Sequence, residues 1–118
     1  MLLKRELGTA GENLAVAFLR KNGCTIICRN FRTRWGEIDL IARCKNIILF
    51  IEVKTRSNAD FAQPWEAVGF RKRKHLKAAA KLYIQEHPHS GVEYRFDVVS
   101  ITLKETCEPE IEWIQQAF

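Results

Sequence analysis

Charged side chains interrupt two apolar stretches of this sequence, and three of them could do chemistry together. Asp39 stands in the first stretch, while Glu52 and Lys54 stand in the second, among isoleucines, leucines, a valine and a phenylalanine. Two carboxylates that meet would repel, so one is protonated, a lysine neutralises them, or a metal ion lies between them. A hard cation such as Mg²⁺ binds one or two carboxylates and keeps water and substrate phosphates as its other ligands.

The two stretches bring the acids together if they are antiparallel strands of one hairpin. Side chains alternate between the two faces of a strand, so Glu37 accompanies Asp39, and Lys54 accompanies Glu52. A turn centred on residues 45–46 makes residues face each other when their numbers sum to 91, which places Asp39 opposite Glu52. The same register places Glu37 opposite Lys54, and a shift by two residues would turn both pairs into diagonal neighbours.

A salt-bridged polar patch is the alternative interpretation of the same residues. Glu37 with Lys54 is a plausible ion pair, and neighbouring arginines could satisfy the other carboxylates on a sheet surface that faces solvent. The strand pattern alone leaves both interpretations open. Two acids on neighbouring strands, a lysine two residues after the second acid and a basic chain together favour the metal site.

The remaining sequence predicts the elements that position this hairpin. The expected helices and strands are, in chain order, Leu7–Asn22, Cys24–Asn30, Gly36–Ala42, Ile47–Thr55, Pro64–Glu86 with a break near Gly69, Tyr94–Leu103 and Glu110–Ile114. The long second helix allows a crossover to a parallel strand, so the order α-β-β-β-α-β-β predicts an α/β fold with a mixed β-sheet flanked by helices. No repeat or linker interrupts the chain, and we expect residues 1–118 to form a single domain.

Composition excludes several classes of protein. The N-terminus has no apolar stretch of signal-peptide length, and the longest apolar run, Ile47–Ile51, is too short to cross a bilayer. We therefore expect a cytoplasmic protein without a membrane partner. The four cysteines show no tight pair of the kind that zinc sites use, which favours plain reduced thiols, namely Cys24, Cys28, Cys44 and Cys107.

Positive charge gathers in two places, and the formal net charge of +5 suggests a polyanionic partner. On the second helix, Arg71, Lys74 and Lys77 can share one face and neutralise phosphates, although a solvated helix face is the common alternative. Three arginines flank the hairpin and are predicted to be the closer phosphate contacts, namely Arg32, Arg34 and Arg56. Trp35 and Trp65 could stack on bases, but core or loop packing is the more common role.

The same residues resemble a known nuclease signature. Asp39, a gap of twelve residues and "EVK" (residues 52–54) resemble the PD-(D/E)xK motif, with Ile38 in place of the proline. "GENLAVAFLRKNG", "NFRTRWGEIDLIA", "FIEVKTR" and "YRFDVVSI", in this order and spacing, resemble the bacterial YraN family over nearly the full length. That family is presumed nucleolytic and is similar to archaeal Holliday-junction resolvases. The resemblance implies a single restriction-endonuclease-like nuclease domain over residues 1–118.

The resemblance also implies roles for individual residues. Asp39 and Glu52 would bind Mg²⁺ or Mn²⁺, with the carbonyl oxygen of Val53 as a third ligand. Lys54 would orient the attacking water or stabilise charge that develops on the phosphate. Glu12 corresponds to the helix glutamate of the resolvases. A carboxylate near a helix start, favoured by the helix dipole, is the alternative for Glu12.

The expected function is therefore a Mg²⁺- or Mn²⁺-dependent endonuclease that acts on nucleic acid, on DNA in preference to RNA. Branched or junction DNA as the substrate, and a homodimer that makes paired cuts, are borrowed from the resolvase similarity. A non-catalytic nucleic-acid-binding or scaffold module, or a protein-interaction domain, are the alternatives. The lysine beside two acids favours the enzyme, and no role is predicted for Glu37, for Gln63 or for the cysteines.

Overall fold

The computed structural model describes residues 4–57, 69–105 and 107–118, which form two helices and five strands. They are α1 (Lys4–Lys21), β1 (Thr25–Arg32), β2 (Glu37–Cys44), β3 (Ile47–Ser57), α2 (Phe70–Glu86), β4 (Glu93–Leu103) and β5 (Glu110–Ile114). The predicted order α-β-β-β-α-β-β is confirmed. The predicted helix start at Pro64 lies outside the described residues, as do Gln63 and Trp65.

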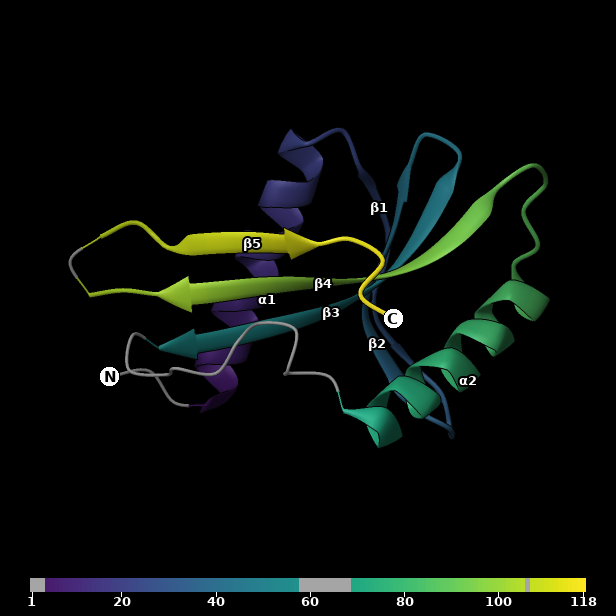
Figure 1. Ribbon diagram of the computed structural model, residues 1–118, viewed down its shortest axis with the longest axis horizontal. Coiled ribbons are helices and arrows are strands. Elements are labelled where there is room, and N and C mark those ends of the chain that lie inside the picture. Colours follow the sequence, from purple (N-terminus) through teal and green to yellow (C-terminus); the bar gives the residue numbers. More distant parts are fainter. Residues whose placement is uncertain (1–3, 58–68, 106) are drawn as a thin grey trace.

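The strands form one mixed sheet in the order β1-β2-β3-β4-β5 (Figure 1). Only β3 and β4 pair in parallel, and α2 lies in the connection between them, as a parallel pair requires. The other three pairs of neighbouring strands are antiparallel. The predicted α/β class with a mixed sheet flanked by helices is confirmed. Within the described part of the chain, neither helix is long and apolar enough to span a bilayer.

The two helices cover opposite faces of the sheet (Figure 1). Ala15, Val16 and Leu19 recur at helical spacing on α1 and pack onto one face, where Leu40 and Ile51 are fully buried. On α2, the buried positions form a second stripe that packs onto the other face, namely Leu76, Ala79, Ala80 and Tyr83. The sheet is therefore buried on both sides.

The hairpin of β2 and β3 has the predicted register. Every pair of opposed residues, from Cys44 and Ile47 to Leu40 and Ile51, sums to 91. The ladder ends at that last pair. Ile38 packs under α2 although Leu40 packs under α1, so the strict alternation expected of this strand is wrong at its start. On the side of Leu40 away from the turn the two strands part, and there the Asp39 side chain reaches the backbone N–H of Val53.

Two glycines fix how closely each helix approaches the sheet. A Cβ atom on Gly11 of α1 would lie 1.7 Å from the hydroxyl oxygen of Thr55 on β3. A Cβ atom on Gly36, just before β2, would lie 2.8 Å from the backbone carbonyl oxygen of His75 on α2. Neither position has room for a side chain, so both helices are set against the strands that carry the acids.

Candidate functional site

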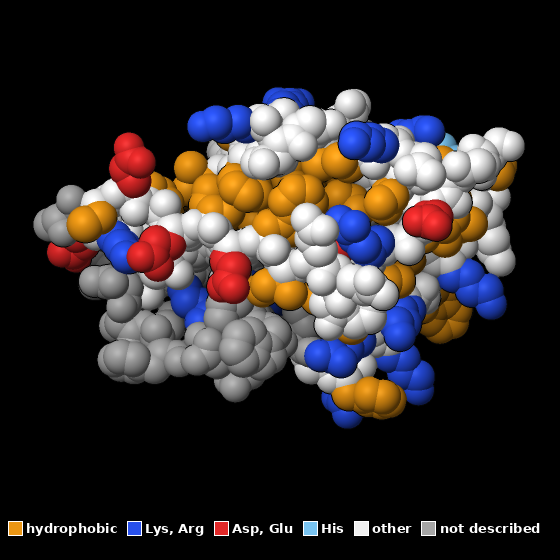
Figure 2. All heavy atoms as spheres, turned by 45° about the horizontal axis from the view of Figure 1, so that its top comes forward, with side chains coloured by type: hydrophobic (Ala, Val, Ile, Leu, Met, Phe, Trp, Pro, Cys, Tyr) orange, Lys and Arg blue, Asp and Glu red, His pale blue; other side chains and the backbone are white. Residues whose placement is uncertain are grey.

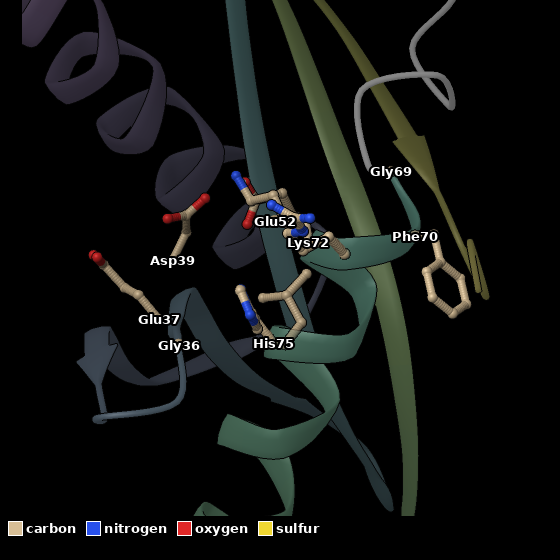
Figure 3. A pocket seen from close by; sticks show the side chains of 10 residues that line it. Gly36, Glu37, Asp39, Glu52, Gly69, Phe70, Lys72 and His75 are labelled. Carbon is tan, nitrogen blue, oxygen red and sulfur yellow. The ribbon is translucent and has the colours of Figure 1, made fainter.

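A pocket of about 610 Å³ opens where β2 and β3 part, beneath the first turns of α2 (Figure 3). Its wall consists of Gly36, Glu37, Asp39, Glu52, Gly69, Phe70, Arg71, Lys72, His75 and Leu76. Asp39 and Glu52 enter it from neighbouring strands, and Lys72 reaches Glu52 from the helix (Figure 3). The two acids that the hairpin register places opposite each other thus line one pocket.

The carboxylates of Asp39 and Glu52 are close enough to influence each other. Glu52 is only 3% exposed, and Asp39 accepts a hydrogen bond of 2.8 Å from the backbone N–H of Val53. Burial and the negative charge of Glu52 raise the pKa of Asp39 from its ordinary value of 3.8 to about 7, against the opposing effect of the Val53 hydrogen bond. Burial and the nearby Glu52 carboxylate thus oppose the ionisation of Asp39.

Two ammonium groups share one oxygen of Glu52. The Nζ atom of Lys72 pairs with Oε1 of Glu52, and Nζ of Lys54 lies 3.8 Å from the same oxygen. Burial lowers the pKa of Lys54, and the neighbouring charge of Lys72 lowers it further. Burial also lowers the pKa of Lys72, but the hydrogen bond and charge of Glu52 outweigh it, so that pKa is raised. Lys72 is therefore the principal cation on Glu52.

Val53 turns its backbone polar groups toward Asp39. The N–H and C=O of one strand residue point to the same side, and the N–H of Val53 points to the Asp39 carboxylate. The carbonyl oxygen therefore faces the gap in which the β2–β3 ladder has ended. This orientation suits the role of third ligand that the resemblance implies for Val53.

The donor set fits a hard divalent cation. It offers two carboxylates and a backbone carbonyl, all oxygen donors, in a pocket with room for water. Among the described residues, no group of three or more His, Cys, Asp or Glu side chains could hold a metal, so a closed all-protein site is absent there. Mg²⁺ and Mn²⁺ accept such a partial set because water and substrate supply the other ligands, whereas structural zinc does not.

Glu12 is not among the described residues that line this pocket. Its Oε1 atom accepts a hydrogen bond of 3.0 Å from Asn30 and lies 3.5 Å from Nη2 of Arg29, both on β1. Because α1 begins at Lys4, Glu12 is well inside the helix, and the alternative of a helix-start carboxylate is wrong. The catalytic role stays a prediction, since Glu12 contacts none of the pocket carboxylates within the described part of the chain.

The predicted pairing of Glu37 with Lys54 is wrong. Glu37 lies 3.6 Å from Arg32, its register partner on β1, and both side chains are largely exposed. Lys54 turns instead to Glu52 on its own strand. The hairpin opens beyond Leu40, so the extrapolated register does not bring these two side chains together.

The other predicted basic residues lie around the pocket and along α2. Arg71 lines the pocket, and Lys74 and Lys77 are exposed further along the helix. Arg34 stacks on the exposed Trp35, with its guanidinium carbon 4.5 Å from the ring centre. Arg56 is half-buried on β3, on the face that alternation gives to Glu52 and Lys54.

Sequence reasoning missed two residues of the pocket and misjudged a third at its edge. Lys72 lies four residues before the buried Leu76, so its place at the head of the apolar stripe of α2 was a usable signal. Phe70 is 83% exposed at the start of α2 and gave no signal. The preference for packing of Trp35 is wrong, because this side chain is 54% exposed.

Comparisons with known proteins place the chain in a family. The sequence model of the "Uncharacterised protein family UPF0102" matches residues 11–101. A UPF0102 protein of Caldicellulosiruptor saccharolyticus is 45% identical over 116 residues, which cover 98% of each chain. One from Syntrophomonas wolfei is 48% identical over 116 residues, 98% of this chain and 100% of that protein. Among solved structures, that of Pyrococcus furiosus SfsA in complex with Ca²⁺ is similar to this chain with a TM-score of 0.35 and 15% sequence identity. The match covers 95% of this chain and 63% of that one, and a likeness this weak carries no argument.

Proposed function

The chain belongs to protein family UPF0102, as its resemblance to the YraN family predicts, and on this premise we propose that it is a metal-dependent nuclease that hydrolyses phosphodiester bonds. One observation carries the proposal. Asp39 and Glu52 meet in a single pocket, with burial and mutual repulsion opposing their joint ionisation, beside two lysines. Such an arrangement is costly to fold and is typical of sites that bind a cation.

In this proposal Asp39, Glu52 and the Val53 carbonyl hold one Mg²⁺ or Mn²⁺ ion. The bound ion would polarise the phosphate and lower the pKa of a coordinated water. Lys54 has its ammonium near Glu52 and a side chain 30% exposed, so it can face both the carboxylate and a phosphate in the pocket. Its positive charge would then stabilise the charge that develops on the phosphate oxygens.

Charge is unevenly distributed along the molecule, which supports a nucleic-acid substrate. In the view of Figure 2, most acidic side chains lie at the end near the β4–β5 connection, whereas Lys and Arg side chains predominate along the upper edge and at the end that carries α2. Arg71 stands at the pocket itself, and Lys74 and Lys77 extend the positive charge along α2. A phosphate backbone laid along α2 would therefore reach the carboxylates.

DNA, and branched DNA in particular, is the substrate that we propose. The exposed aromatic rings of Trp35 and Phe70 are suited to stack on unpaired or unstacked bases, which flaps and open branch points provide and intact duplexes do not. Paired incisions in a junction need two copies of the site, so the proposal includes a homodimer on such substrates.

A cleavage assay on plasmid DNA and synthetic four-way junctions, with Mg²⁺, Mn²⁺ or EDTA, tests the proposal. We expect cutting with either metal and none with EDTA. The isosteric variants Asp39→Asn and Glu52→Gln should abolish cutting, whereas the matched control Glu86→Gln, at the exposed end of α2, should cut normally. Binding without cutting under every condition would support a non-catalytic module instead.

A further inference from the structure

Two cations lie on Glu52, and Lys72 differs from Lys54 because it comes from a helix and not from the sheet. It is the third residue of α2, and its Nζ atom pairs with the nearly buried Oε1 of Glu52. Lys54 lies 3.8 Å from the same oxygen, so the motif lysine is the more distant partner. The cation in closest contact with the motif glutamate is therefore one that the motif does not contain.

The charge count of the pocket shows what this contact does. Asp39 and Glu52 bring two negative charges when both are ionised, and Lys54 and Lys72 bring two positive charges. These four groups thus balance one another without a metal when both acids are ionised. A divalent ion on the same carboxylates would leave an excess of two positive charges, and bare ammonium groups repel such an ion strongly at low dielectric.

We propose that Lys72 occupies, in the metal-free protein, the place on Glu52 that the divalent ion takes, and that it swings away when the ion binds. This inference rests on the proposed function and deepens it. Lys72 is then a positioning residue: it keeps a nearly buried carboxylate paired until the ion arrives, and afterwards it stands beside Arg71 at the mouth of the pocket, where a phosphate would enter.

The fold allows this movement without disturbing α2. The Lys72 side chain is 44% exposed and has four rotatable bonds, so its ammonium group can reach water by a change of rotamer alone. Further along α2, the core contacts of Leu76 and Tyr83 and the close approach of Gly36 to His75 hold the helix in place. Lys54 extends from a central strand, and its side chain is less exposed, at 30%.

Titration of Mn²⁺ into the full chain by calorimetry tests the exchange directly. We compare the wild type with Lys72→Met and with Lys81→Met, which removes the same charge from an exposed position on the same helix. Lys72→Met should bind Mn²⁺ about tenfold more tightly, a factor that corresponds to about 1.4 kcal/mol, because the ammonium group closest to Glu52 no longer competes with the ion. Lys81→Met should match the wild type.

The outcomes separate this inference from the proposed function. If the wild type binds Mn²⁺ and Lys72→Met binds it equally or more weakly, the exchange is wrong while the metal site stands. If neither protein binds Mn²⁺ at saturating concentration, the metal-dependent nuclease fails, and the exchange fails with it.

A measurement on the wild type covers the case in which Lys72→Met does not fold. Acetylation of lysines by a water-soluble acyl ester, read by mass spectrometry, reports how free each ammonium group is. Addition of Mn²⁺ should increase the acetylation rate of Lys72 severalfold and leave that of Lys81 unchanged. An unchanged or slower rate at Lys72, in a protein that binds Mn²⁺, overturns the exchange.

Discussion

Two buried acids lie almost side by side in the central strands, yet they face opposite sides of the sheet and differ in their surroundings. Glu52 of β3 pairs in register with the residue after Asp97 of β4. Asp97 is fully buried and accepts hydrogen bonds from fixed donors: two from Arg95 at 2.8 and 2.9 Å, one from the Trp113 ring at 2.8 Å and one from the Gln116 N–H at 3.0 Å. Glu52 is paired with the mobile ammonium groups of lysines.

The difference separates a structural carboxylate from one that is available for chemistry. Donors on β4, β5 and the C-terminal segment saturate Asp97, so it has no capacity for a ligand. Asp39 accepts one backbone hydrogen bond and faces Glu52, a like charge, in an open pocket. A buried acid is thus a candidate for function when its partners can leave, and burial alone does not make it one.

Replacement of Asp97 gives the largest effect that the comparison predicts. Asp97→Asn should lower the free energy of unfolding by about 3–5 kcal/mol, because it leaves the Arg95 guanidinium without its charged partner in the sheet. Urea unfolding at neutral pH measures it. Unchanged stability in Asp97→Asn would mean that the saturated network is not structural, and the contrast with Glu52 would fail.

A methyl group at Gly36 should disturb the pocket side of the sheet. Gly36→Ala should cost about 1–3 kcal/mol, because the added carbon meets the rigid backbone of α2 at His75. Gly8→Ala on α1 is the matched control: among the described residues nothing lies within 4 Å of the added carbon, and alanine in a helix should stabilise by about 0.5–1 kcal/mol. Equal effects of the two substitutions on thermal unfolding would contradict the close helix approach.

The pH dependence of stability should reveal the strain between Asp39 and Glu52. Because the pKa of Asp39 is about 7 when folded and ordinarily 3.8, the folded protein holds a proton between these values that the unfolded chain has lost. Stability should therefore fall as pH rises from about 4 to about 7. Asp39→Asn keeps an acceptor for Val53 but removes the charge, so its stability relative to the wild type should rise from pH 4 to pH 8.

Urea unfolding of both proteins in EDTA, across this range of pH, measures the effect. EDTA matters because a bound divalent ion would relieve the repulsion and hide it. A stability difference between the two proteins that stays constant from pH 4 to pH 8, without metal, would show that the two carboxylates do not strain the fold.

Loss of single lysines from α2 should produce the smallest effects. Lys74→Met and Lys77→Met should each weaken DNA binding and reduce the slope of log affinity against log salt concentration by about 1. Lys21→Met, at the end of α1 on the other side of the sheet, should leave the slope unchanged. Equal slopes for all three variants would mean that DNA does not favour the pocket face over the α1 face.

The sequence predicted the part of the site that depends on a short hairpin. The turn at residues 45–46 fixes the register by local geometry, and every observed pair of β2 with β3 follows from it. The meeting of Asp39 with Glu52 could therefore be predicted. Extrapolation of the same register to Glu37 and Lys54 failed because the strands part on the side of Leu40 away from the turn.

Contacts between distant segments could not be predicted in this way. Asp97 acquires partners from β5 and beyond, 16 and 19 residues along the chain, and its own segment carries no sign of them. Lys72 is one of several basic residues at the start of α2, and the run itself does not distinguish it from the others. Its contact with Glu52 depends on how α2 crosses the sheet. The position of a helix on a sheet depends on tertiary packing. The spacing of residues in the sequence indicates it only through the stripe of apolar residues that become buried.

Diffraction from crystals of the full chain soaked in MnCl₂, recorded at the manganese absorption edge, tests the central claim most directly. The account predicts an anomalous peak between the carboxylates of Asp39 and Glu52, within about 2–2.5 Å of an oxygen of each. A fully soaked crystal whose two carboxylates point apart, with no peak between them, would contradict it.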